Sequence, residues 1–128
     1  MRGIEGEQVL LRVILSESRT LDHVPLHRRI LELLRQEGLA GATVLSGLAG
    51  FGHDRRMHTT AIEVVAEGLP VVVEAVDTQE RIERVLPLIE ALMSGGGVIT
   101  LERAQVIRYA RATIGPDTAW ITGRGRIG

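Results

Sequence analysis

The sequence predicts an α+β domain of the ferredoxin-like βαββαβ class, with an antiparallel sheet covered by two helices on one face. The first observation is the order of the periodic segments: strand, helix, strand, strand, helix, strand. The second is a length of 128 residues, which suits a single domain. The third is a composition of 45% hydrophobic and 24% charged residues, typical of a globular protein.

The first half of the chain supplies a strand, a helix and a short strand. Residues 9–15 alternate with the period of a strand, and both faces are largely apolar apart from Arg12. Pro25 suits the first turn of a helix, whose apolar positions recur every three or four residues. Residues 42–48 form the next strand, which ends at the glycine-framed segment 50–52.

The centre of the chain is predicted as a hairpin that holds one additional strand. Residues 59–66 and 70–76 are predicted as two strands around a tight turn at 67–69. Residues 70–76 are apolar on both faces, with Glu74 as the exception. Because two helices cover only one face, the other apolar face is expected to be buried by self-association, as a closed ring.

The second helix is expected to begin after Asp77, which is predicted as its cap. Glu80, three residues further on, completes a capping-box-like pattern. Pro87 lies inside this helix and is expected to kink its axis. The three glycines at 95–97 end the helix.

The last strand is expected over residues 98–109, with a break near Arg103. After Tyr109 the periodicity vanishes, while glycine, threonine and arginine become frequent. We therefore predict one domain over residues 1–110 and a loosely ordered tail over 111–128.

Composition excludes several classes of function. A net charge of −1 and only three aromatic residues argue against a nucleic-acid partner. All 15 basic residues are arginines, so a phosphate would have to be held by arginine and backbone N–H groups. The absence of cysteine excludes thiol chemistry and fits a reducing compartment. No signal-peptide pattern is present, and a cytoplasmic location is predicted.

Two features could bind an anion. Gly95, Gly96 and Gly97 could present successive N–H groups to a phosphate, or they could simply stop the helix and turn the chain. Arg108, at the end of the last strand, could form a bidentate hydrogen bond to phosphate oxygens or an ordinary surface ion pair.

The polar loop between residues 52 and 59 is the candidate partner-binding segment. His53, Asp54 and His58 have side chains that can ligate metals, but a solvated or partner-facing loop is the favoured interpretation. Arg55 and Arg56 are expected at the tip, where they could contact an anionic effector or partner.

No catalytic constellation is apparent. Glu17 lies between two serines at the end of the first strand, but no histidine or second carboxylate is tied to it by spacing. The sequence therefore predicts a protein that is not an enzyme and requires no cofactor.

Short segments in a fixed order resemble the PII-like signalling proteins, and most closely the bacterial and archaeal PII-like family known as domain of unknown function 190. The resemblance runs from about Leu10 to Tyr109. The segments that carry it are residues 15–18, 25–26, 38–44, 50–52, 57–59, 69–74 and 106–109.

The resemblance implies a ferredoxin-like homotrimer whose sheets face inward, with an effector loop after Gly50-Phe51-Gly52 that docks on a partner protein. It also implies that an adenine nucleotide (ATP, ADP or AMP) binds in clefts between subunits. Carried across, the residues at these clefts are Gly50, Gly52, Gly95, Gly96, Gly97, Arg108 and, as a looser match, Arg111.

The chain also departs from classical PII proteins. It lacks their lysine in the turn after the second helix, and its shorter loop has no tyrosine for uridylylation. Some members of the family accompany small membrane channels, so a membrane transporter is one partner to consider.

Three hypotheses therefore stand. The first is a regulatory trimer that binds a small anionic effector, the second a ligand-free trimeric interaction module, and the third a divalent-metal-binding or tolerance protein using His53 and His58.

Overall fold

The computed structural model describes residues 4–52, 55–59 and 68–109. The predicted tail therefore lies outside the described residues. Within them the elements are, in chain order, β1 (Gly6–Ser16), β2 (Thr20–Leu21), β3 (Val24–Pro25), α1 (Leu26–Gln36), β4 (Thr43–Ser46), β5 (Ala49–Gly50), β6 (His58–Thr59), β7 (Pro70–Asp77), α2 (Gln79–Met93) and β8 (Val98–Val106).

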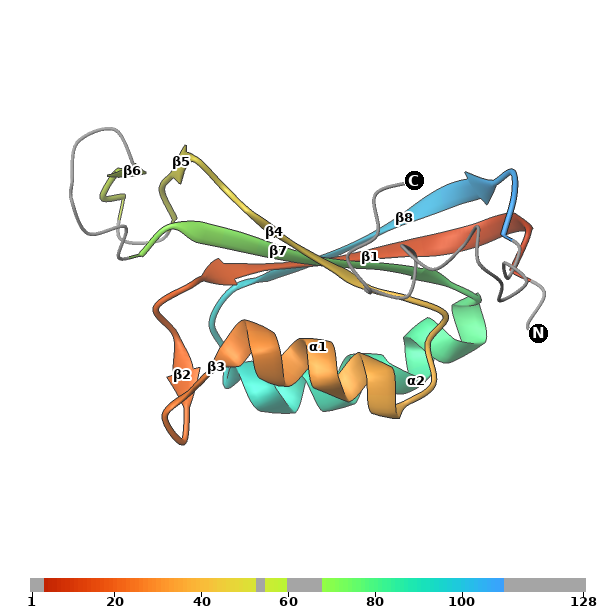
Figure 1. Cartoon of the computed structure of the whole chain (residues 1–128), viewed down its shortest axis with the longest axis horizontal. Coiled ribbons are helices and arrows are strands. Elements are labelled where there is room, and N and C mark those ends of the chain that lie inside the picture. Colours follow the sequence, from red (N-terminus) through yellow and green to blue (C-terminus); the bar gives the residue numbers. More distant parts are fainter. Residues whose placement is uncertain (1–3, 53–54, 60–67, 110–128) are drawn as a thin grey trace, which may run out of the picture.

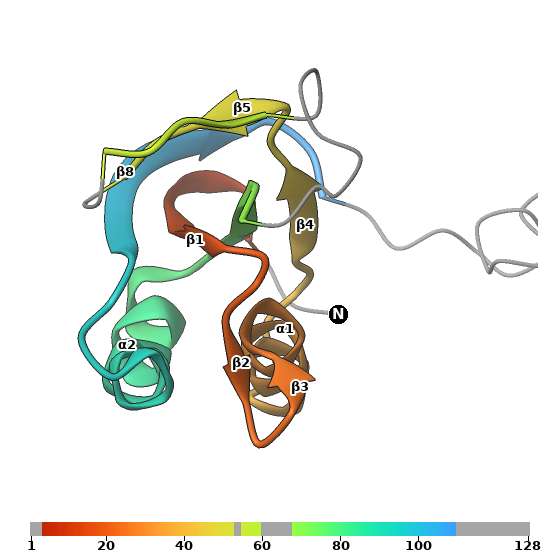
Figure 2. The same cartoon turned by 90° about the vertical axis from the view of Figure 1, so that its left-hand side faces the viewer.

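The four main strands form one antiparallel sheet in the order β4-β7-β1-β8. The two views of the chain show α1 and α2 side by side on the same face of this sheet (Figures 1 and 2). This arrangement confirms the predicted α+β class. In the described part of the chain, neither helix has the length and apolar character needed to cross a bilayer.

The helix-covered face of the sheet holds the core. In β1, Leu11 and Val13 are fully buried, and they lie opposite Ala75 and Val73 of β7. The helices bring their own apolar stripes onto these strands. The buried helix residues in this cluster are Leu26, Ile30, Leu34, Ile82, Val85, Ile89 and Met93.

The other face of the sheet is apolar but has a charged centre. Arg12 of β1 lies between two carboxylates: its Nε is 2.7 Å from Glu74 Oε2 and its Nη1 is 2.7 Å from Glu102 Oε1. Hydrogen bonding to Glu74 raises the pKa of Arg12. Leu10 and Ile14 flank Arg12 along the strand and are only half-buried. We call this surface, formed by Leu10, Arg12, Ile14, Val72, Glu74, Val76, Val98 and Glu102, the open face.

The cap of the second helix is not the one predicted. Thr78 is the N-cap, and its hydroxyl accepts a hydrogen bond from the backbone N–H of Arg81 at 3.2 Å. Asp77 is instead the last residue of β7 and is fully buried. Its carboxylate accepts from Ala40 N at 2.8 Å and from Thr78 N at 2.7 Å. The α2 helix runs through Pro87 without ending there.

The predicted break in the last strand is also wrong. Arg103 lies opposite Val9, and pairing with β1 continues without interruption from Val98 to Val106. The side chain of Arg103 points to solvent and pairs with Glu7, so its charge does not have to be buried in the strand.

The second strand of the predicted central hairpin is confirmed as β7 (Pro70–Asp77), whereas most of its first strand cannot be compared. Residues 60–67 lie outside the described residues, and β6 pairs with β5 in a small separate sheet. A second small hairpin, β2–β3, was not predicted. Its two loop residues, Asp22 and His23, have φ of 53° and 68°, as a type I′ turn requires. Pro25 ends this hairpin and directly precedes α1.

Candidate functional site

The two glycine segments predicted to bind a ligand lie at the same end of the sheet. Antiparallel pairing places the end of β1 beside the start of β7, with Ser16 opposite Pro70, and beside the start of β8, with Ile14 opposite Val98. Figure 1 shows β5 and the end of α2 at this same end of the molecule.

The glycines before the loop are explained by a proline. A Cβ atom placed on Gly47 or Gly50 would lie 2.7 or 3.1 Å from Cγ of Pro70. The backbone therefore approaches Pro70 more closely than a larger residue would allow. Gly52, in contrast, has no heavy atom within 4 Å of such a Cβ. Of the two predicted loop glycines, only Gly52 faces open space.

The described part of the predicted partner loop exposes both apolar and basic side chains. Phe51 is 59% and Met57 64% exposed, and the guanidinium of Arg55 lies 5.8 Å from the centre of the Phe51 ring. Arg56 is also exposed. This combination suits contact with a partner that offers both an apolar surface and negative charge.

Of the two loop histidines, the structure describes only His58. His58 is half-buried, and its imidazole lies against Gly68, where a Cβ would come within 2.7 Å of Nδ1. His53 and Asp54 lie outside the described residues. Across residues 4–52, 55–59 and 68–109, no group of three or more potential metal-ligating side chains is present.

The turn after α2 has the backbone geometry expected of a glycine-rich stop. Ser94 caps the helix with φ of 51°, and its N–H donates to Glu90 O at 3.2 Å. Gly95 and Gly97 have φ of 87° and 90°. Gly97 also lies against Ile14, whose carbonyl oxygen would be 2.9 Å from a Cβ atom. We call residues 95–97 the glycine turn.

Sequence reasoning missed one cation beside the glycine turn. The side chain of Arg19, which follows β1, reaches the end of α2, and its Nη2 donates to Met93 O at 2.6 Å. The contact joins residues 74 positions apart, and no local pattern around Arg19 marks it.

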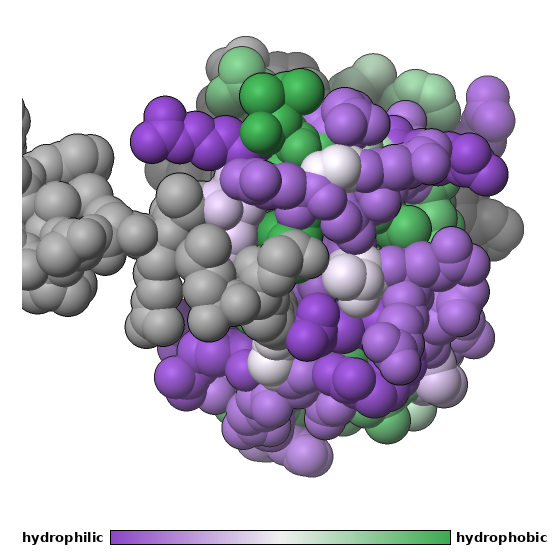
Figure 3. Space-filling view, turned by 90° about the vertical axis from the view of Figure 1, so that its right-hand side faces the viewer, coloured by the Kyte–Doolittle hydropathy of each residue, from purple (hydrophilic) through white to green (hydrophobic). Residues whose placement is uncertain are grey.

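Arg108 lies at the opposite end of the sheet from the glycine turn. It is exposed and follows the end of β8 at Val106. The eight steps from Val98 to Val106 amount to about 26 Å at the usual rise of a strand. Viewed from the Arg108 end, the described surface is mostly hydrophilic (Figure 3). Arg111 lies outside the described residues.

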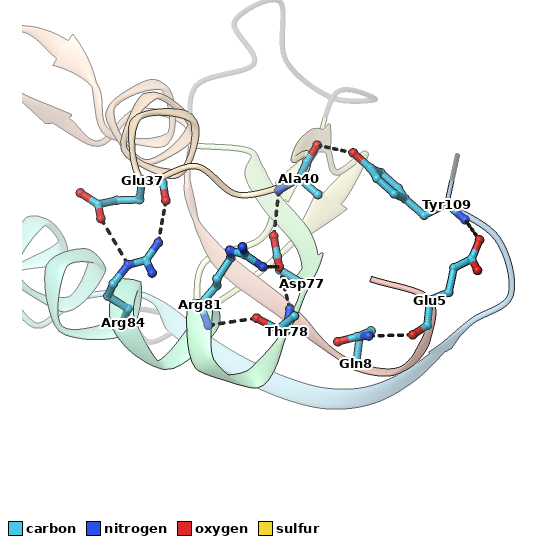
Figure 4. Close-up of polar contacts among 9 residues, drawn as sticks. All are labelled: Glu5, Gln8, Glu37, Ala40, Asp77, Thr78, Arg81, Arg84 and Tyr109. Atoms are coloured by element: carbon cyan, nitrogen blue, oxygen red, sulfur yellow. Dashed lines mark hydrogen bonds and ion pairs between the residues drawn. The ribbon is translucent and has the colours of Figure 1, made fainter. Parts of the chain in front are cut away.

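Polar contacts fix the chain next to Arg108. The N–H of Tyr109 donates to Glu5 Oε2 at 2.9 Å, and the Tyr109 hydroxyl lies 3.5 Å from Ala40 O. The N–H of Ala40 donates to the Asp77 carboxylate, so the loop before β4 is held between Asp77 and Tyr109 (Figure 4). These bonds set where the chain leaves the last strand.

A shallow hollow of about 260 Å³ lies between the start of α2 and β8. Its lining contains no residue predicted to bind a ligand. The lining residues are Val9, Gln79, Ile82, Glu83, Leu101, Glu102 and Arg103.

The described residues of one chain therefore do not bring the predicted ligand-binding residues together. The glycine turn and Gly52 are at one end, and Arg108 is a full strand length away. A single small ligand therefore cannot reach both sets within the described part of one chain.

The fold is that of the PII-like proteins. CPII, a nitrogen regulatory PII-like protein from Thiomonas intermedia K12 solved bound to ADP, AMP and bicarbonate, is similar with a TM-score of 0.61 and 20% identity. The match covers 80% of this chain and 90% of CPII. A putative PII-like signalling protein from Thermus thermophilus matches with a TM-score of 0.58 and 19% identity, over 80% of this chain and 91% of that one.

The chain belongs to the DUF190 family, whose model, described as "Uncharacterized ACR", matches residues 8–106. A UPF0166 protein of Aquifex aeolicus is 37% identical over 77% of this chain and 91% of that protein. A UPF0166 protein of Methanocaldococcus jannaschii is 31% identical over the same shares. The family resemblance in the sequence is thus confirmed.

Proposed function

We propose that this protein is a PII-like regulatory protein without enzymatic activity. It forms a homotrimer, binds an adenine nucleotide in the clefts between subunits, and acts on a partner protein through the loop at residues 52–59. The observation that carries the proposal is the placement of the glycine turn and Arg108 at opposite ends of one protomer. A cleft between chains would bring the two together, and the fold is shared with CPII, which was solved bound to ADP, AMP and bicarbonate.

The open face supports the trimer. Leu10, Ile14, Val72 and Val76 form an apolar surface on a sheet whose other side is already covered by helices. Exposed apolar surfaces of this kind are typical of protein interfaces. The Arg12 ion pairs at its centre give the interface a charged group that can select one orientation of the sheets.

The test combines mass and binding. Light scattering on the full chain at micromolar concentration should give three times the mass of the 14.0 kDa protomer. Titration calorimetry with ATP, ADP, AMP and cyclic AMP should show saturable binding of at least one nucleotide. A monomer, or the absence of binding at millimolar nucleotide, would contradict the proposal.

A ligand-free interaction module is the second candidate. It is favoured by the packing of Gly50 against Pro70 and of Gly97 against Ile14, which explains these glycines without a ligand. This alternative expects no nucleotide to shift the melting temperature, and Arg108→Ala to leave partner binding intact.

A further inference from the structure

The backbone around Arg19 holds its side chain beside the glycine turn. Its N–H donates to Ser16 O at 3.2 Å, and its carbonyl accepts from Leu26 N at 2.8 Å, at the start of α1. The side chain then crosses to the end of α2, where Nη2 donates to Met93 O. The position of this cation is therefore set by the ends of three elements.

The guanidinium lies directly on Gly96. A Cβ atom on Gly96 would come within 2.5 Å of Nη1 and 3.1 Å of Cζ of Arg19. Nη1 is buried, and among the described residues it has no hydrogen-bond partner. A buried donor without an acceptor is costly, so donating to an additional oxygen ligand would lower the free energy of this nitrogen.

The charge of Arg19 is also not balanced by any carboxylate of the described residues. Among the described residues, ion pairs occupy Arg12, Arg35, Arg81, Arg84 and Arg103, but not Arg19. The last turn of α2 contains no basic residue, so Arg19 is the cation that faces the negative end of this helix. Without such a cation, an anion would be repelled from a helix C-terminus.

The glycine turn adds backbone geometry suited to an anion. Gly95 and Gly97 have φ of 87° and 90°, and the N–H of the intervening Gly96 donates to Met93 O at 3.2 Å. The N–H groups of this turn that can face an anion are therefore those of Gly95 and Gly97. A Cβ atom placed on Gly95 would meet no heavy atom within 4 Å, so that side of the turn has room for a ligand.

We infer that Arg19 binds the phosphate of the nucleotide at the glycine turn. This inference rests on the proposed function and assigns its phosphate subsite to a residue outside the predicted set. Nη1 forms a charge-assisted hydrogen bond to a phosphate oxygen, while Nη2 stays on Met93. Because Nη1 is buried in the protomer, the turn shifts to admit the oxygen, and Gly95 provides the space.

Calorimetry on the full chain tests this, with ADP, AMP and adenosine as ligands. Arg19→Gln should weaken ADP and AMP binding at least about tenfold, because it removes the charge and the forked donors. Adenosine, which has no phosphate, should bind both proteins equally. Arg35→Gln is the matched control: it removes an exposed arginine from α1 and should leave all three ligands unaffected.

Gly96→Ala provides a second variant that keeps the arginine. Its Cβ displaces the guanidinium, and the φ of Gly96 lies outside the left-handed region. The same selective loss of ADP binding is expected. Gly41→Ala, where a Cβ meets nothing within 4 Å, is its control.

Each outcome decides a different claim. If Arg19→Gln binds ADP as tightly as the natural chain, the role of Arg19 is refuted while the proposed function stands. If Arg19→Gln weakens the binding of ADP and of adenosine by the same factor, Arg19 only supports the turn, and the inference is again refuted. If the natural chain binds none of the three ligands, the proposed function fails as well.

Discussion

Leu10 and Leu11 are neighbours in β1, yet they lie in very different environments. Leu11 is fully buried beneath the helices, whereas Leu10 is half-buried on the open face. The covered face holds the apolar core, whereas the open face has three charged side chains at its centre. This difference indicates that the covered face stabilises the protomer, while the open face is suited to contact with other chains.

Leu11→Ala should give the largest loss of stability. Truncating a fully buried leucine typically costs about 2–5 kcal/mol, from lost burial and the cavity left behind. Urea unfolding at several protein concentrations would measure the loss. Leu10→Ala is the matched control, and it should cost under about 1 kcal/mol in the dissociated protomer. Equal losses for the two variants would contradict the division between the faces.

Asp77→Ala should give the second-largest loss of stability. Asp77 lies on the covered side of β7 and accepts two backbone N–H groups, those of Ala40 and Thr78. Removing the acceptor leaves these two partly buried donors unpaired, at a cost of about 1–3 kcal/mol. Thermal and urea unfolding would report it. Asp77→Asn keeps an acceptor oxygen and should cost less; a larger loss in Asn than in Ala would argue against this role.

Arg12→Gln should have a smaller effect on the protomer. The side chain is 37% exposed, so water can solvate the carboxylates that it leaves behind. Its effect should instead be on the proposed self-association, because Glu74 and Glu102 would then face the proposed interface without a cation. Sedimentation velocity would show weaker self-association, and Glu74→Gln in the same chain should restore part of it. If Arg12→Gln associates as tightly as the natural chain, the ion pairs do not contribute to the proposed interface.

Val72→Glu should change the unfolding of the protomer least, by under about 1 kcal/mol. On the open face, however, it places a charge among Ile14 and Leu45, its partners in the neighbouring strands. Light scattering should therefore show that the proposed trimer dissociates. Leu88→Glu, on the exposed side of α2, is the control and should leave the assembly intact. Dissociation by both variants alike would show that the effect is not specific to the open face.

Periodicity in the sequence was enough to predict the class of fold, both helices and the two faces of the central strands. It failed where one side chain had two possible partners. Asp77 fits both a helix cap and the end of a strand, and only the tertiary contact with Ala40 decides between them. Arg103 suggested a break because a charge at an edge strand looks the same in sequence as a charge in a loop.

The glycines of the candidate site could be predicted from the sequence, but the residues that pack against them could not. Gly95, Gly96 and Gly97 are visible as a run, but their neighbours Ile14, Met93 and Arg19 come from distant parts of the chain. The close approach of Gly50 to Pro70 is likewise set by strand pairing rather than by local sequence.

The separation of the glycine turn from Arg108 by the length of β8 has a genetic consequence for the proposed assembly. Chains with an inactive glycine turn and chains with an inactive Arg108 should restore nucleotide binding when they are mixed. In the mixed assembly, some of the proposed clefts then combine an intact glycine turn from one chain with an intact Arg108 from its neighbour. Nucleotide would also favour the assembled form over free chains by mass action, so dilution of the protein should lower its apparent affinity.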